Sequence, residues 1–188
     1  MTLPLRLLAV VLGLWLVVPA AGLTAGGNDP APELTIRSAD GGAYYIAARF
    51  HVAAPVAVVH AVLTDYEGIP RFMPGVRASR VLEREAGRTR VAQEAVSRYM
   101  LFSKRVFLEL EITEAPGVIQ FTDRIGRSFT RYAGSWTVAT ADAGTMVGYE
   151  LDAAPAFSVP AFVLRKLLDR DARAMIDGLR AEIATRIR

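Results

Sequence analysis

Residues 52–76, VAAPVAVVHAVLTDYEGIPRFMPGV, form the segment that decides the fold. Pro55 suits the first turn of a helix, because its missing N–H would have no partner there. The apolar residues that follow recur at the spacing of one helix face, namely Val58, Val59, Val62 and Leu63. The pattern predicts a helix that starts near Pro55 and ends near Leu63.

The chain then turns a sharp corner. Thr64 and Glu67 are three residues apart, the spacing of a capping box, which predicts a second, short helix. Pro70 limits this helix to about one turn, and Pro74, followed by Gly75, ends it. The bulky residues Phe72 and Met73 lie between these prolines, either as ordinary core residues or as the rim of a cavity.

A β-hairpin is predicted before this segment and a run of strands after it. Two β-prone runs, 34–38 and 44–52, flank an Asp-Gly turn. Six later strands are expected at 76–85, 89–102, 105–114, 118–124, 129–139 and 145–152. Between residues 106 and 112, apolar side chains alternate with Glu109 and Glu111, as in an antiparallel sheet that is buried on one face.

One long amphipathic helix, expected from about residue 160 to 187, closes the chain. Its apolar stripe consists of Leu164, Leu168, Ala172, Met175, Ile176, Leu179 and Ile183. Gly178 interrupts this helix, at an expected cost of about 1 kcal/mol relative to Ala.

These elements predict an α+β domain in which a curved antiparallel sheet of about seven strands wraps around the C-terminal helix. Two short helices follow the first strand. One helix cannot fill the inside of such a sheet, so we expect a cavity beside it, bordered by the sheet, the helix and the corner at 65–75. Cavities of this kind are mostly apolar with a few placed polar groups.

The N-terminal segment, residues 1–22, has the order of a secretory signal: a basic residue, an apolar run from Leu7 to Val18, then small residues. That run is shorter than the roughly 20 residues that a spanning helix needs. We therefore expect an exported protein, periplasmic or secreted, with an uncleaved membrane anchor as the alternative. Residues 23–43 are expected to be a flexible lead-in that can hold one extra strand.

Composition argues against several function classes. The chain has no cysteine, which excludes disulfides, thiol catalysis and cysteine metal sites. Two histidines cannot build a three-histidine site, and no phosphate loop or dinucleotide fingerprint is present, so we expect no metal and no cofactor. The 22 basic and 19 acidic residues alternate without a basic block, so nucleic acid is not an expected partner.

Several short motifs follow one another in a characteristic order between about residues 44 and 186. They are Ala54-Pro55, Val62-Leu63-Thr64-Asp65, Pro70, Phe72, Pro74, Gly134-Ser135-Trp136, Pro155, Phe157 and Pro160. In this order the chain resembles the START-like helix-grip superfamily (SRPBCC), which includes polyketide cyclases/dehydrases and coenzyme Q-binding proteins. The resemblance implies a helix-grip fold over residues 44–188, with an internal cavity for a hydrophobic small molecule or lipid.

We expect a ligand to contact residues from the corner, the inner sheet face and the closing helix. They are Phe72, Met73, Leu108, Leu110, Phe121, Tyr132, Trp136, Tyr149, Leu164, Leu168 and Met175. Tyr132 is the preferred polar contact, because strand alternation from Trp136 turns Tyr132 inward and Arg131 outward. A buried tyrosine hydroxyl needs a partner, and a ligand oxygen would serve.

Two functions fit this sequence. The first is an exported, non-enzymatic carrier of a lipid, quinone or isoprenoid-like molecule, with transient membrane contact. The second is a polyketide cyclase- or dehydratase-like enzyme acting on an apolar or aromatic substrate, with Glu94, Tyr132 and Glu150 as candidate acids or bases. Glu94 and Arg98 share a strand face, as an exposed ion pair or as an acid–base set. A protein-binding module is a third alternative that the fold permits.

Overall fold

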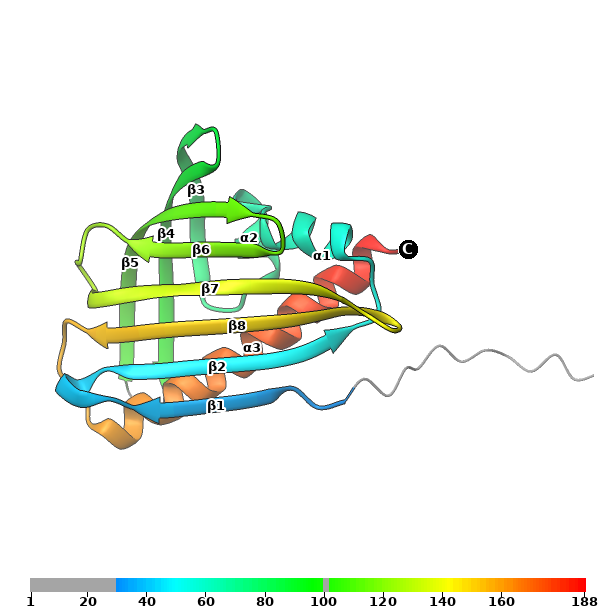
Figure 1. The fold of residues 1–188 in the computed structure, drawn as a ribbon. Helices are drawn as coiled ribbons and strands as arrows, with labels where there is room; N and C mark the ends of the chain where they lie inside the picture. Colours follow the sequence, from blue (N-terminus) through cyan, green and yellow to red (C-terminus); the bar gives the residue numbers. More distant parts are fainter. Residues whose placement is uncertain (1–29, 100–101) are drawn as a thin grey trace, which may run out of the picture.

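The computed structural model describes residues 30–99 and 102–188. They form one antiparallel sheet of eight strands that curves around a long helix, α3 (Figure 1). The strand order is β1-β2-β8-β7-β6-β5-β4-β3. The predicted signal segment and the start of the lead-in, residues 1–29, lie outside the described residues.

Strands make up most of the described chain. They are β1 (Glu33–Ser38), β2 (Tyr44–Val52), β3 (Val76–Glu85), β4 (Arg88–Tyr99), β5 (Phe102–Ala115), β6 (Val118–Asp123), β7 (Phe129–Ala141) and β8 (Gly144–Pro155). The helical elements are η1 (Asp40–Gly42), α1 (Val56–Leu63), η2 (Tyr66–Gly68), α2 (Ile69–Phe72) and α3 (Ala161–Arg186). α3 contacts α1 and α2 and also β1 and β4, which lie at or beside the two edges of the sheet. The sheet therefore grips the helix from both sides.

The predicted N-terminal hairpin is confirmed. β1 pairs antiparallel with residues 44–49 of β2, and the turn holds Gly41 and Gly42 at φ 71° and 76°. Side chains other than glycine rarely adopt such angles. The sheet of the described residues has eight strands, one more than the expected number of about seven. The additional strand, β1, lies within the predicted lead-in.

The six later strands are also confirmed, with one difference that affects the site. β4 and β5 pair as far as Tyr99↔Phe102, so β5 begins three residues before the predicted strand 105–114. Ser103 and Lys104, which the sequence analysis left between strands, belong to the sheet.

The corner after α1 is not built by the predicted capping box. Thr64 still belongs to the last turn of α1: its hydroxyl donates to the carbonyl oxygen of His60 at 2.9 Å. Thr64 is therefore not free to start the next turn. Asp65 starts it instead, because its carboxylate accepts a hydrogen bond from the backbone N–H of Gly68 at 3.1 Å.

Asp65 also ties the corner to the C-terminal end of α3. Its Oδ2 accepts hydrogen bonds from Arg71 at 2.7 Å and from Arg186 at 2.5 Å. Arg186 is itself held by Glu182, one turn earlier in α3, at 2.8 Å. The hydrogen bond from Arg186, with the charge of Arg71, lowers the pKa of the Asp65 carboxyl from its usual value.

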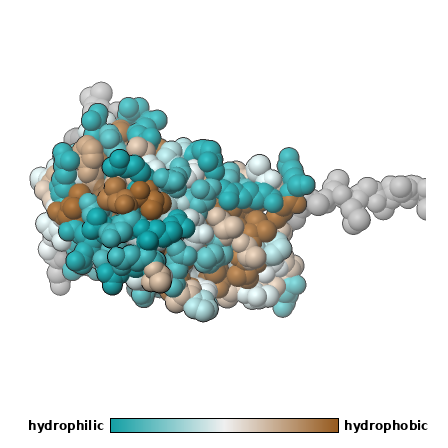
Figure 2. Space-filling model, turned by 90° about the horizontal axis from the view of Figure 1, so that it is seen from above, coloured by the Kyte–Doolittle hydropathy of each residue, from teal (hydrophilic) through white to brown (hydrophobic). Residues whose placement is uncertain are grey.

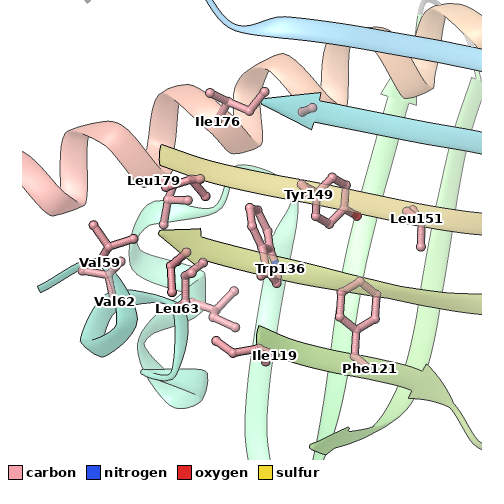
Figure 3. Close-up of a cluster of buried hydrophobic side chains, with 14 of the residues drawn as sticks. Val59, Val62, Leu63, Ile119, Phe121, Trp136, Tyr149, Leu151, Ile176 and Leu179 are labelled. Atoms are coloured by element: carbon pink, nitrogen blue, oxygen red, sulfur yellow. The ribbon is translucent and has the colours of Figure 1, made fainter. Parts of the chain in front are cut away.

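Buried apolar side chains of the core meet where α1, α3 and the sheet come together (Figure 3). Val59 and Val62 of α1 and Leu179 of α3 have no exposed surface. The molecular face in Figure 2 mixes hydrophilic and hydrophobic areas: one brown patch is surrounded by teal, and further brown atoms lie toward the other end of the face. Within residues 30–99 and 102–188, no helix combines the length and apolar character needed to cross a membrane.

Gly178 marks the place where α3 comes closest to the corner. A Cβ atom here would lie 2.0 Å from the carbonyl oxygen of Phe72 and 3.2 Å from Cδ of Pro74. These atoms belong to the backbone and to a proline ring, so they cannot move aside as a flexible side chain would. The glycine in the predicted helix thus permits a backbone contact that any other residue would block.

Helix propensity alone predicts that Gly178→Ala stabilises the protein by about 1 kcal/mol. The contact with Phe72 reverses the sign, and we expect a loss of roughly 1–3 kcal/mol in the free energy of unfolding, as in other overpacked sites. Urea unfolding followed by tryptophan fluorescence measures this difference. The control is Ala181→Gly, on the exposed face of α3, which changes propensity without touching the corner. A more stable Gly178→Ala protein would contradict the close approach.

The Asp65–Arg186 contact predicts a defined dependence of stability on pH. Because the folded-state pKa of Asp65 is lowered, its contribution is present above the unfolded value of about 4 and is lost as the pH falls through the lower folded-state value. We expect Asp65→Asn to lower the unfolding midpoint near neutral pH, and the difference from the wild type to vanish in acid. Asp169→Asn, which removes an exposed pair with Arg173, is the control and should change little. A difference independent of pH would refute the ionic role of Asp65.

Candidate functional site

A cavity of about 430 Å³ lies between the concave face of the sheet, α3 and the corner at residues 65–75. All eleven residues expected to contact a ligand line it: Phe72, Met73, Leu108, Leu110, Phe121, Tyr132, Trp136, Tyr149, Leu164, Leu168 and Met175. Contact of these residues with a ligand stays a prediction. Phe157, Ser158 and Val159, between β8 and α3, complete the wall on the side opposite the corner.

One wall of the cavity is a continuous row of aromatic rings. Its members, in spatial order, are Trp136, Tyr149, Phe121, Tyr132, Phe129 and Phe157. Neighbouring ring centroids are 4.4 to 6.3 Å apart, the range of favourable aromatic contacts. Figure 3 shows how Trp136, Tyr149 and Phe121 project from three adjacent strands toward the same side.

The facing wall is aliphatic. It is formed by β5, through Val106, Leu108 and Leu110, and by α3, through Leu164, Leu168 and Met175. Leu168 and Met175 are only partly buried, although they lie on the apolar stripe of α3. A ligand could cover the surface that these two side chains leave open.

Tyr132 and Tyr149 place two hydroxyl groups inside this apolar space. A hydrogen bond joins the two side chains. Burial raises the pKa of Tyr132 to about 12 and raises the pKa of Tyr149 well above its usual value. Both hydroxyls are therefore protonated at neutral pH, so the pair can offer a hydrogen bond to a ligand oxygen but cannot act as a base there.

A second set of polar groups, which was not predicted from the sequence, lies at the rim of the cavity. Ser97 of β4 donates a short hydrogen bond to Asp171 of α3, and Arg170 donates to the other oxygen of that carboxylate at 2.6 Å. Lys104 of β5 lines the same part of the cavity. For Ser97 the signal was present in the alternation of β4, where Val91, Gln93, Ala95 and Ser97 share one face of the predicted strand 89–102. Lys104 was hidden, because the predicted strands left residues 103 and 104 between them.

The two carboxylates considered for catalysis do not line the cavity. Glu94 pairs with Arg105 at 3.2 Å rather than with Arg98. Glu150 is exposed and accepts a hydrogen bond from Tyr45. Arg131 lies outward, as alternation predicted, and pairs with Asp152 at 2.9 Å. The acid–base interpretation of Glu94 with Arg98 is therefore wrong.

His60 lies in a separate open hollow between α1 and the β5–β6 turn. Its Nε2 is 3.9 Å from a carboxylate oxygen of Glu114, which also accepts a hydrogen bond from Tyr66 at 2.7 Å. In the part of the chain that the structure describes, no three His, Cys, Asp or Glu side chains come together as a metal site would require.

Solved structures with the same architecture include an aromatase/cyclase, a STAR-related lipid transfer protein and human STARD10. The aromatase/cyclase Zhui from Streptomyces sp. R1128 is 19% identical with a TM-score of 0.67, over 78% of this chain and 96% of that chain. The STAR-related lipid transfer protein from Xanthomonas axonopodis is 18% identical (TM-score 0.66), over 81% of this chain and 93% of that fragment. Human STARD10 is 13% identical (TM-score 0.62), over 80% of this chain and 73% of that chain. At these identities the likeness shows the fold alone, and it confirms the expected helix-grip architecture.

No curated protein sequence matches the chain. The family model described as polyketide cyclase / dehydrase and lipid transport matches residues 52–180, which is well over half of the 188 residues. The matched range contains the corner, strands β3 to β8 and most of α3, which are the elements that enclose the cavity. The chain therefore belongs to the polyketide cyclase/dehydrase and lipid transport family.

Proposed function

We propose that this protein is an exported carrier that holds one hydrophobic small molecule, such as a lipid, quinone or isoprenoid, in the cavity beneath α3. The observation that carries the proposal is the cavity itself: about 430 Å³ with aromatic and aliphatic walls. This volume falls in the range of about 300–1,000 Å³ that is typical of small-molecule sites. Export rests on the signal-like order of residues 1–22.

Burial of apolar surface is enough to hold such a cargo. Water at about 30 Å³ per molecule would fill the cavity with on the order of a dozen molecules, most of them without good hydrogen-bond partners. A ligand that replaces them and buries roughly 300 Å² of apolar surface gains about 7 kcal/mol, before the cost of lost freedom. The tyrosine pair then adds a directional contact for one ligand oxygen.

The enzyme alternative has less support. A cyclase or dehydratase needs a general acid or base inside the site. Glu94 and Glu150 lie outside the cavity, and burial raises the pKa values of the two tyrosines, so neither tyrosine can act as a base at neutral pH and only their hydroxyl protons remain for acid chemistry. A carrier needs none of these groups to ionise.

A carrier must also exchange its cargo. Phe162, in the first turn of α3, has 71% of its surface exposed and follows the cavity-lining residues 157–159. An exposed phenylalanine beside a cavity wall suits transient contact with a membrane, because apolar side chains such as Phe, Trp and Leu on a surface-bound helix enter the boundary between head groups and acyl chains. We include such contact in the proposal.

Native mass spectrometry of the protein from its own host's exported fraction tests the carrier function. We expect a start near residue 23 and a stoichiometric apolar passenger that solvent extracts. A protein that is empty, and that takes up neither lipids nor quinones when they are offered, would rule out the carrier. Turnover of an offered apolar substrate would favour the enzyme instead.

Filling the cavity should displace the cargo. Ala95 lines the cavity from β4, whereas Ala92 lies on the opposite face of the same strand. We expect Ala95→Phe to reduce binding of an apolar fluorescent probe at least tenfold, because the ring takes ligand volume. Ala92→Phe is the matched control and should bind the probe like the wild type. Equal loss in both variants would show that the effect is not occupancy of the cavity.

A further inference from the structure

The inward face of β5 changes character toward the rim of the cavity. Successive inward-facing residues are Ile112, Leu110, Leu108, Val106 and Lys104, and all five line the cavity. Four are apolar and the last is a cation. The directly opposite residue on β4 is Ser97, so both strands become polar at the same level. The cavity thus has an apolar interior and a polar end.

Lys104 is the cation at this end. Its ammonium lies 4.4 Å from the ring centroid of Phe157, the last ring of the aromatic row, and its side chain is exposed. Among the described residues, no carboxylate forms an ion pair with it. Asp171, the other charged residue on the wall, already accepts hydrogen bonds from Ser97 and Arg170. Lys104 is therefore the charged group of the wall whose hydrogen-bonding capacity is left for a ligand.

We propose that the cavity takes an amphiphile with a single anionic head, a carboxylate or a phosphate, which binds Lys104 at the rim while its apolar body extends along the aromatic row. This inference rests on the proposed function and names its ligand class. An ammonium has three donors and no acceptor, and it makes its strongest hydrogen bonds with anionic oxygens. A cationic head would be repelled from the same place.

The competing explanation is that Lys104 only covers the ring of Phe157. An exposed cation–π contact of this kind contributes about 0.5–1 kcal/mol and would concern stability alone. It predicts no discrimination between head groups. A ligand series that varies only the head therefore separates the two explanations.

Four ligands with twelve carbons in the chain, the carboxylate carbon included, provide this series: dodecanoate, dodecyl phosphate, dodecan-1-ol and dodecyltrimethylammonium. Binding is measured by displacement of an apolar fluorescent probe, below the micellar concentrations. We expect the two anions to bind more tightly than the alcohol, and the cation most weakly. Lys104→Gln should weaken both anions roughly 3- to 30-fold, given a charge-assisted contact at an exposed rim. Dodecan-1-ol should be unaffected, and Lys104→Arg should retain most of the preference for anions.

Lys166 provides the matched control, because it is the other lysine of the chain and does not line the cavity. Lys166→Gln removes the same charge and should leave dodecanoate binding unchanged. An equal loss in both variants would overturn the inference in favour of a general effect of net charge.

Amine labelling gives a second readout that needs no variant. Dodecanoate should slow acetylation of Lys104 but not of Lys166, and dodecan-1-ol should protect Lys104 less. If dodecan-1-ol and dodecanoate bind alike and Lys104→Gln changes neither, the head-group inference is wrong while the carrier function stands. If none of the four ligands binds, the carrier function itself fails. If dodecyl phosphate alone depends on Lys104, the head is a phosphate rather than a carboxylate.

Discussion

One helix has to cover the concave face of a sheet that is too wide for it. Eight strands at about 4.8 Å spacing span roughly 34 Å, whereas a helix with its side chains is about 10–12 Å wide. Curvature closes part of this difference by bringing β4 and β1 to the same helix. The remainder is the cavity. The pocket is thus a consequence of the element order, and its contents depend on which side chains the strands turn inward.

The two halves of α3 experience this constraint differently. The C-terminal half is held tightly: Ile176, Leu179 and Ile183 are almost fully buried, Gly178 touches the corner, and Arg186 binds Asp65. The N-terminal half borders the cavity, and Leu168 there is only partly buried. The contacts with the corner are therefore concentrated at the C-terminal end of the helix, while its N-terminal half borders the cavity.

The polar groups of the cavity also differ between its interior and its rim. The tyrosine hydroxyls lie within the aromatic row, and the serine, aspartate and lysine side chains lie at the rim. The carboxylates of β4 and β8 are on the outer face, where they pair with arginine or tyrosine side chains. This arrangement suits recognition of an elongated molecule with one polar end, because directional contacts are few and the apolar area is large.

Local sequence signals predicted the curved sheet around one helix and the inner face of that sheet, because periodicity and turn residues do not depend on tertiary context. Alternation from Trp136 predicted that Tyr132 faces inward, and the apolar stripe of α3 predicted that Leu168 and Met175 line the cavity. Only the tertiary structure decided how far β4 and β5 pair, and therefore that Lys104 lines the cavity, because strand ends depend on cross-strand partners rather than on propensity. The close contact of Gly178 with Phe72 and the hydrogen bond from Arg186 to Asp65 also became apparent only from the structure. Each joins residues more than 100 positions apart in the sequence, which no local pattern relates.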